Sequence, residues 1–248
     1  MPCNSDELES LDALFKETFI QKVTRDRSRL DPLPMGMEIV EAFRAESPGV
    51  WERYELHRRR VTSRATSSTT ATDASAVRPR TAGIGALLQN RVCAGANLAN
   101  AHLLFHGSNP TSGRSIMQSG LLMDLIGVNK PSPSSKSMFG PGVYLSECVS
   151  KADEYSHDGP ALDGRFAMVV CRAVVGNAYV TGTPGDDSGK VEGGEYDCVV
   201  GDREKEVGTY REFVFFNDSA LYPEFLIMYQ GRYRTDGGAA VQETGERP

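Results

Sequence analysis

The sequence lacks any apolar run near the roughly 18 residues that a membrane-spanning helix requires. It also lacks, in its opening MPCNSDELES, the basic start and apolar stretch of a secretory signal. These absences predict an intracellular protein, nuclear or cytoplasmic, without a membrane as its partner.

Paired cysteines are missing as well. The five cysteines are scattered and odd in number, and no CxxC pair suggests zinc ligation or a disulfide framework. We therefore predict no metal. The thiols are Cys3, Cys93, Cys148, Cys171 and Cys198.

An excess of basic residues is absent, since 27 Lys and Arg face 33 Asp and Glu. The net charge of -6 argues against direct nucleic-acid binding, which needs clustered Lys and Arg. The basic run at residues 57–60 is better explained as a solvated helix end than as a nucleic-acid contact. No GxGxxG or GxxxxGK[ST] pattern occurs, which disfavours a Rossmann or P-loop nucleotide site.

Local composition and the spacing of apolar residues divide the chain into five stretches. The first 35 residues predict an amphipathic helix over Ser5–Val23 and a turn, because their apolar residues recur at helical spacing. Residues 36–61 predict a strand and then a helix that leads into the main domain. A Ser/Thr/Ala-rich linker or loop at 62–81 and a disordered tail at 234–248 have too little apolar surface to fold alone.

Residues 82–233 carry the remaining domain. Short strand-like runs alternate with Gly-rich turns, and one short helix, PTSGRSIMQS, ends at Gly120. This pattern predicts a mainly antiparallel α+β domain.

Three segments of that domain stand out together: LLFHGS at 103–108, MFGPGVYLSECVSKADEY at 138–155 and TYREFVFF at 209–216. Singly, each has a structural explanation, as a strand-end histidine, core tyrosines or a surface glutamate. Their order and spacing together resemble the catalytic domain of poly(ADP-ribose) polymerases and tankyrases. The resemblance is dense from Leu103 to Gln230 and does not cover the first 35 residues.

The resemblance implies the ADP-ribosyltransferase fold, with split antiparallel β-sheets and flanking short helices, and NAD⁺ as co-substrate. It implies that His106 bonds the adenosine ribose and that Gly107 offers its backbone to the nicotinamide carboxamide. A glycine suits that position because a side chain would hold the carboxamide away from the main chain. Ser108 would reach a ribose hydroxyl, although a local turn bond is an alternative.

For the second segment, the resemblance implies that Tyr144 and Tyr155 flank the nicotinamide ring. Lys151 corresponds to a lysine beside the catalytic glutamate, where its charge would tune that carboxylate. Many family members have a serine where this chain has Ala152, so one bond to the carboxamide would be missing. Ser150 or water would substitute for it.

Glu212 is the predicted catalytic residue, because the resemblance places it where a carboxylate stabilises an oxocarbenium-like ribose. In the alternating run REFVFF at 211–216, Glu212 shares a face with Val214 and Phe216, which predicts an apolar environment. Glu224 in YPEFLIMY is the competing candidate. It follows a proline near a strand start, where an exposed position is ordinary.

Other features set limits on the resemblance. The Pro/Ser-rich stretch 121–138 predicts a mobile lid. The HDGPALDGRF stretch holds only His157, so the zinc site of tankyrases is not expected. The DNA-dependent members of the family have a long helical regulatory domain before the catalytic fold. We do not expect that domain here, because too little helical sequence precedes Leu103.

Taken with the resemblance, these residues predict transfer of ADP-ribose from NAD⁺ to acceptor proteins, the chain itself included, with release of nicotinamide. The set His106, Tyr144 and Glu212 is the family pattern associated with poly(ADP-ribose) elongation. Two alternatives stay open: a silent NAD⁺- or ADP-ribose-binding module, which Ala152 favours, and an NAD⁺ glycohydrolase.

Overall fold

The computed structural model describes residues 1–27, 33–67, 77–84, 97–126, 137–156 and 164–233. Eight strands in these ranges form one sheet in the order β1-β8-β4-β2-β3-β7-β6-β5, and only the pair β5–β6 is parallel. The strands are β1 (Gly36–Arg44), β2 (Ala101–Ser108), β3 (Val143–Ser146), β4 (Phe166–Val174), β5 (Ala178–Thr181), β6 (Cys198–Asp202), β7 (Arg211–Phe215) and β8 (Leu221–Arg232).

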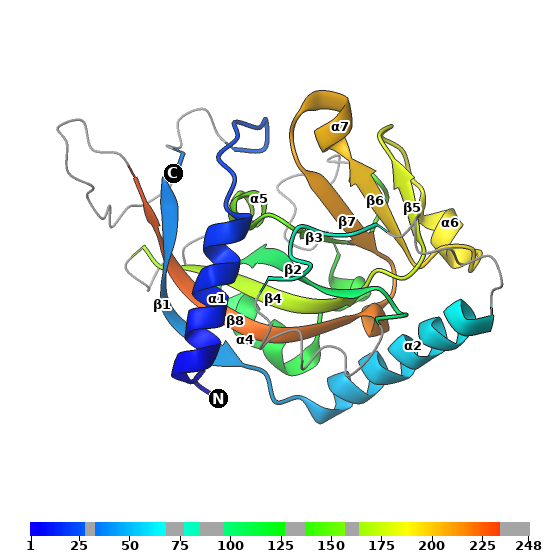
Figure 1. Cartoon of the computed structure of the whole chain (residues 1–248), viewed down its shortest axis with the longest axis horizontal. Coiled ribbons are helices and arrows are strands. Elements are labelled where there is room, and N and C mark those ends of the chain that lie inside the picture. The colour runs from blue at the N-terminus through cyan, green and yellow to red at the C-terminus, as the bar shows by residue number, and fades with distance from the viewer. Residues whose placement is uncertain (28–32, 68–76, 85–96, 127–136, 157–163, 234–248) are drawn as a thin grey trace.

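The sheet is nearly divided between β2 and β3. These two strands pair at one position only, Phe105 opposite Ser146, whereas β2 pairs with β4 along its whole length. Figure 1 shows the consequence, with β1, β8, β4 and β2 on one side and β3, β7, β6 and β5 diverging on the other. The predicted α+β fold with a split antiparallel sheet is confirmed.

The helices are short and lie around this sheet. They are α1 (Ser5–Thr18), α2 (Pro48–Ser67), α4 (Pro110–Ser119), α5 (Val149–Asp153), α6 (Ser188–Glu192) and α7 (Arg203–Val207), with the 3-10 turns η2 (Met123–Leu125) and η3 (Asp218–Ala220). Within the described ranges, none of them is both long and apolar enough to cross a membrane.

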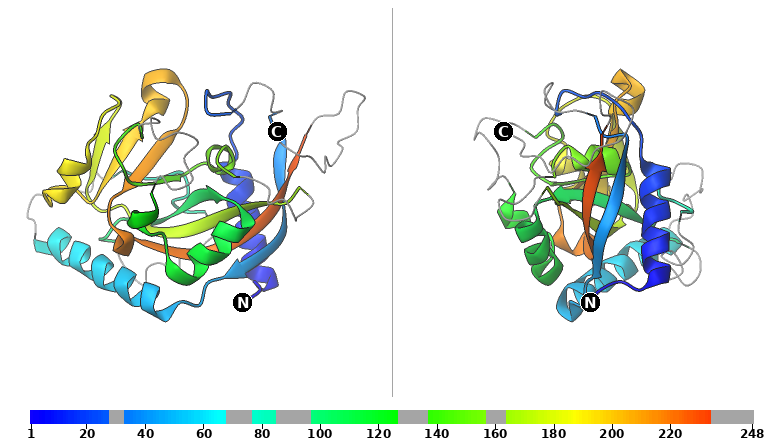
Figure 2. Two further views of the ribbon diagram at one scale, coloured as in Figure 1. Left: turned by 180° about the vertical axis from the view of Figure 1, so that it is seen from behind. Right: turned by 90° about the vertical axis from the view of Figure 1, so that its left-hand side faces the viewer.

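Helices α1 and α4 cover opposite faces of the half that contains β1, β8 and β4 (Figure 2). Asn4 caps α1, and its side chain and that of Glu7 bond each other's backbone N–H in a capping box. Leu11, Leu14 and Phe15 then pack into the core, where the Phe15 ring meets the Phe105 ring edge-on. The first helix is thereby fixed to the strand that leads into the site.

Helix α1 ends at Thr18 and not at Val23, where the apolar spacing predicted its end. The backbone of Ile20 is engaged elsewhere: its N–H donates to Ser150 Oγ, and its carbonyl accepts from Ser150 Oγ and Tyr210 Oη. Tertiary hydrogen bonds thus replace the next helical turn.

Two predicted boundaries also move. Strand β1 pairs with β8 along its length, so residues 36–44 belong to the same sheet as the strands of the main domain into which they were predicted to lead. Helix α2 continues to Ser67, past the predicted start of the linker at residue 62, and Arg64 near its end forms an ion pair with Asp197. The rest of the predicted linker up to 76 and the predicted tail at 234–248 lie outside the described residues.

A buried ion pair lies under α2. Arg172 on β4 donates from Nε and Nη2 to both carboxylate oxygens of Glu224 on β8, at 2.6 and 2.8 Å. Both side chains are about nineteen-twentieths buried, and the guanidinium also lies over the Trp51 ring. The expected exposed position of Glu224 is therefore wrong, because β8 already begins at Leu221, before Pro223, and runs through the core.

We expect Glu224→Gln to lower the free energy of unfolding by about 3–5 kcal/mol, because Arg172 would keep a buried charge without its counter-ion. Thermal and urea unfolding would measure the loss. The control is Asp12→Asn, which breaks the exposed pair with Lys16 on α1 and should change stability by at most about 0.5 kcal/mol. Equal effects of the two substitutions would contradict this account of the core.

Candidate functional site

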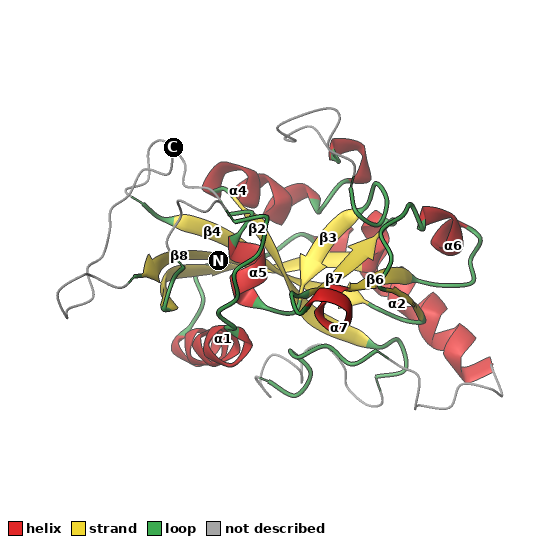
Figure 3. Cartoon of the chain, turned by 90° about the horizontal axis from the view of Figure 1, so that it is seen from above, coloured by secondary structure: helices red, strands yellow, loops and turns green. Residues whose placement is uncertain are grey.

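The predicted site residues gather where the two halves of the sheet diverge. Strand β2 carries His106, Gly107 and Ser108, and β3 and β7 come from the other half with Tyr144 and Glu212. Figure 3 shows α5 next to β2, with β3 and β7 beyond it. The remaining predicted residues, Ser150, Lys151 and Tyr155, lie on α5 and just after it.

His106 connects the two halves. Its ring Nδ1 lies 3.1 Å from the carbonyl oxygen of Tyr144, and since a carbonyl only accepts, Nδ1 carries the proton. Burial lowers the pKa of His106, against the opposing effect of this bond, so the ring is neutral near pH 7. In a neutral imidazole protonated at Nδ1, Nε2 is an acceptor, which suits a ribose hydroxyl.

Gly107 lies directly against α5. A Cβ built on it would lie 2.0 Å from the carbonyl oxygen of Ala152 and 3.1 Å from the backbone nitrogen of Ser156. Glycine is therefore needed here for the approach of α5 to β2, in addition to the predicted approach of a carboxamide. The neighbouring Ser108 is buried, and its hydroxyl makes no hydrogen bond to any residue that the structure describes.

Tyr144 is fixed at its hydroxyl. The Oη accepts from the backbone N–H of Phe139 at 2.8 Å and donates to the carbonyl of Gly140 at 3.0 Å. Burial is the main cause that raises the pKa of Tyr144, to about 12, so the phenol stays neutral. Its ring is half-buried, and the partners in both bonds belong to the FGPG stretch just before β3.

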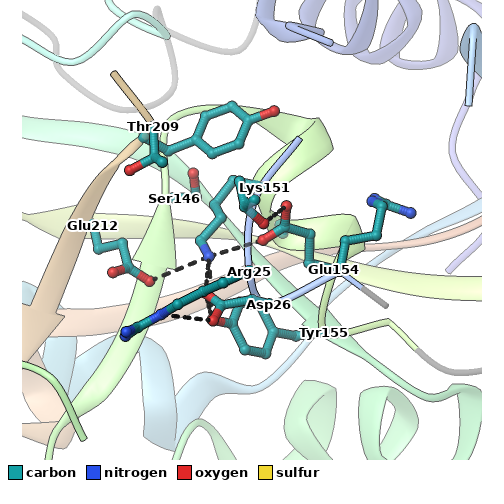
Figure 4. Close-up of polar contacts among 12 residues, drawn as sticks. Arg25, Asp26, Ser146, Lys151, Glu154, Tyr155, Thr209 and Glu212 are labelled. Atoms are coloured by element: carbon teal, nitrogen blue, oxygen red, sulfur yellow. Dashed lines mark hydrogen bonds and ion pairs between the residues drawn. The ribbon is translucent and has the colours of Figure 1, made fainter. Parts of the chain in front are cut away.

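Lys151 is the centre of charge in the site (Figure 4). Its Nζ donates to Asp26 at 2.7 Å, to Glu154 at 2.8 Å and to Tyr155 Oη at 3.2 Å. Burial would lower the pKa of Lys151, but the negative charges around it, that of Glu212 first, outweigh burial and raise that pKa. The ammonium is thus held charged although its side chain is only 6% exposed.

Glu212 points into the same space from β7, where it lies opposite Ser146 on β3. Lys151 Nζ is 3.8 Å from Glu212 Oε1, and within the described part of the chain the carboxylate has no hydrogen-bond donor. Burial raises the pKa of Glu212, and the charge of Lys151 opposes that rise. A largely buried carboxylate without a donor is ready to accept one from a substrate hydroxyl.

Ser150 on α5 is already engaged by contacts with the N-terminal segment. Ser150 Oγ donates to the Ile20 carbonyl at 2.6 Å and accepts from the Ile20 N–H, so it fastens the N-terminal segment. A contact between Ser150 and the carboxamide, as a substitute for the missing serine at 152, would require these bonds to break. Ala152 itself is buried in the core against β2.

Residues that the sequence did not indicate enter the site from the segment Ile20–Arg27. Asp26 accepts from Lys151 Nζ and from Tyr155 Oη, the latter at 2.9 Å, and Thr24 donates to Glu154 at 2.6 Å. The segment reads IQKVTRDR, which resembles a charged continuation of a helix, and no local pattern marks it as part of a site.

The described residues fit the chemistry of NAD⁺. A carboxylate lacking a donor, a neutral imidazole acceptor, a serine hydroxyl and two tyrosines surround the junction between the two halves of the sheet. Within the described ranges, no group of three or more His, Cys, Asp or Glu side chains is arranged to hold a metal. His157 and most of the predicted lid, 127–136, lie outside the described residues.

We expect Gly107→Ala to destabilise the protein by about 1–3 kcal/mol, because its methyl group collides with backbone atoms of α5. Differential scanning calorimetry would measure the change. The matched control is Gly49→Ala in α2, where a Cβ meets nothing within 4 Å and stability should be unchanged or slightly higher. A Gly107→Ala protein as stable as the wild type would refute the close approach of α5 to β2.

No curated protein sequence matches the chain significantly. The family model described as the poly(ADP-ribose) polymerase catalytic domain matches residues 16–231. That match starts well before Leu103 and covers the segment Ile20–Arg27, which the motif resemblance left out. The chain therefore belongs to the poly(ADP-ribose) polymerase catalytic domain family, whose members use NAD⁺ as co-substrate for ADP-ribosyl transfer.

Proposed function

We propose that this chain transfers ADP-ribose from NAD⁺ to protein acceptors and releases nicotinamide. The observation that carries the proposal is the state of Glu212: largely buried, without a hydrogen-bond donor among the described residues, and 3.8 Å from a charged lysine. Family membership supports the reaction class, and this carboxylate supports turnover by this particular chain.

In the proposed reaction, Glu212 accepts a hydrogen bond from the 2′-hydroxyl of the nicotinamide ribose. As the C1′–N bond breaks, the electron pair leaves with nicotinamide and positive charge develops on the ribose. A carboxylate held in a water-poor site stabilises that charge more in the transition state than in the ground state. The acceptor then forms the new bond at C1′ and gives its proton to a base, a role open to Glu212.

The other predicted residues hold the dinucleotide in place. The rings of Tyr144 and Tyr155 flank the nicotinamide, and backbone groups of Gly107 bond its carboxamide. His106 Nε2 accepts from the adenosine ribose, and Ser108 Oγ bonds a ribose hydroxyl. Without a serine at position 152, the carboxamide keeps fewer partners, which should raise the KM for NAD⁺ more than it lowers kcat.

The set His106, Tyr144 and Glu212, as in the tankyrase-like class, supports elongation to poly(ADP-ribose) as a further proposal. We propose acceptor proteins, the chain itself included, as partners in an intracellular compartment. A silent binding module is disfavoured by Glu212, and a glycohydrolase would use the same pocket with water as the acceptor.

We expect Glu212→Gln to lower kcat by about 10²–10³-fold while NAD⁺ still binds, because the amide keeps the shape of the side chain and loses its charge. Labelled NAD⁺ would follow both protein-attached label and free nicotinamide. The control is Glu9→Gln on the exposed face of α1, which should leave both unchanged. Free ADP-ribose without attached label would assign the glycohydrolase, and no nicotinamide from the wild type would assign the binding module.

We expect Lys151→Met to move the acid limb of the kcat/KM profile to higher pH. The lysine charge lowers the pKa of Glu212, so without it that pKa rises and Glu212 becomes ionised only at higher pH. Initial rates between about pH 4 and 9 would show the shift. Lys151→Arg keeps the charge and should hold the limb near its wild-type position, and an unmoved limb in Lys151→Met would disprove the coupling.

A further inference from the structure

Asp26 makes two contacts that join an unassigned segment to the proposed catalytic group. One carboxylate oxygen, Oδ2, accepts from Lys151 Nζ at 2.7 Å and from Tyr155 Oη at 2.9 Å. Figure 4 shows Asp26 between these two side chains, with Glu212 on the far side of the lysine. Asp26 therefore bonds Lys151 and Tyr155 at the same time.

The first consequence concerns which carboxylates the Lys151 ammonium bonds directly. Asp26 and Glu154 bond the ammonium at 2.7 and 2.8 Å, whereas Glu212 lies 3.8 Å from it. A direct ammonium–carboxylate bond would occupy the oxygen that must accept from the ribose. Asp26 thus draws Lys151 away and leaves Glu212 without a donor.

The second consequence concerns Tyr155, a residue that is 47% exposed. An exposed ring has several accessible rotamers, and ordering it on substrate binding costs conformational entropy. The bond from Tyr155 Oη to Asp26 and the Lys151 ammonium 4.8 Å from the ring centroid fix the ring before a ligand arrives.

Asp26 can do this because its segment is anchored on both sides of it. Arg27 forms an ion pair with Asp153 in which both side chains are less than 5% exposed. Ile20 is bonded to Ser150 and Tyr210, and Lys22 Nζ donates to Glu204 at 2.9 Å. These bonds attach the segment to α5 and to the chain before β7.

We propose that Asp26 is a positioning residue of the active site, which holds Lys151 away from Glu212 and fixes Tyr155 for stacking. The inference rests on the proposed function, since it assigns Asp26 a part in the same NAD⁺ site. The charged groups that face Asp26 are Lys151 and Arg25, with Glu154 and Glu212 as repelling neighbours and Tyr155 as a donor.

The first test is the pH profile of Asp26→Asn. Removing the Asp26 charge lets Lys151 pair with Glu212 and removes a charge that raises the pKa of Glu212. The acid limb of kcat/KM should move to lower pH, opposite to Lys151→Met, and kcat should fall several-fold. A purely structural role for Asp26 would leave the limb in place, and that result would overturn the proposal.

The second test needs no turnover. We expect Asp26→Ala to weaken binding of carba-NAD⁺, a cleavage-resistant analogue, about tenfold in calorimetry, because Tyr155 loses its partner. Asp26→Glu, which keeps the carboxylate, should recover part of the affinity. The control is Asp12→Asn, which breaks the exposed pair with Lys16 on α1 and contacts neither Lys151 nor Tyr155, so it should keep wild-type affinity.

These readouts separate the two proposals. Wild-type protein that binds carba-NAD⁺ but releases no nicotinamide from NAD⁺ would end the transferase proposal, and Asp26 is then judged by affinity alone. Unchanged affinity in Asp26→Ala would overturn the positioning role. Tighter binding or faster turnover in Asp26→Ala would overturn it too, because the segment would then obstruct the site.

Discussion

The organisation of the site depends on one ammonium group, that of Lys151. It lies 94% buried between carboxylates from three separate parts of the chain: Asp26, Glu154 and Glu212. A buried charge is tolerated only where it is paired, so these carboxylates and the lysine must be assembled together. Helix α5, only five residues long, has too few internal bonds to form alone and depends on this assembly for its position.

On strand β7, neighbouring residues have different roles: one stabilises the fold, and the next faces the candidate site. Successive side chains of a strand point to opposite faces, so Arg211 and Glu212 have different surroundings. Arg211 donates to Glu147 at 2.6 and 2.7 Å and serves the scaffold, while Glu212 faces Lys151 without a donor among the described residues. On α5, Ser150 and Lys151 also have different roles. Ser150 is bonded to Ile20, and Lys151 is bonded to the charged side chains of the site.

The predictions that the structure confirms rested on local sequence motifs. The split α+β fold and the grouping of His106, Tyr144, Lys151 and Glu212 follow from segments whose spacing is constrained by strands, and the structure brings these residues together. Their roles toward NAD⁺ stay predictions. What could not be predicted comes from contacts distant in sequence: the end of α1 at Thr18 depends on Ser150, and the burial of Glu224 depends on Arg172. Asp26 belongs with these, because a single aspartate among charged residues has no local signature.

The anchoring of Ile20–Arg27 has a consequence for how the protein is made. Its bonds to Ser150, Lys151 and Tyr155 join residues 125 to 130 positions apart, and its bond to Tyr210 spans 190. Contacts of such separation form late, because a long loop must close before they contribute. During synthesis, the segment emerges before all of these partners, and the last of them, Tyr210, comes directly before β7. A nascent chain that ends at Tyr155 would therefore still lack the geometry of the candidate site, so the proposed reaction with NAD⁺ is linked to completion of the fold.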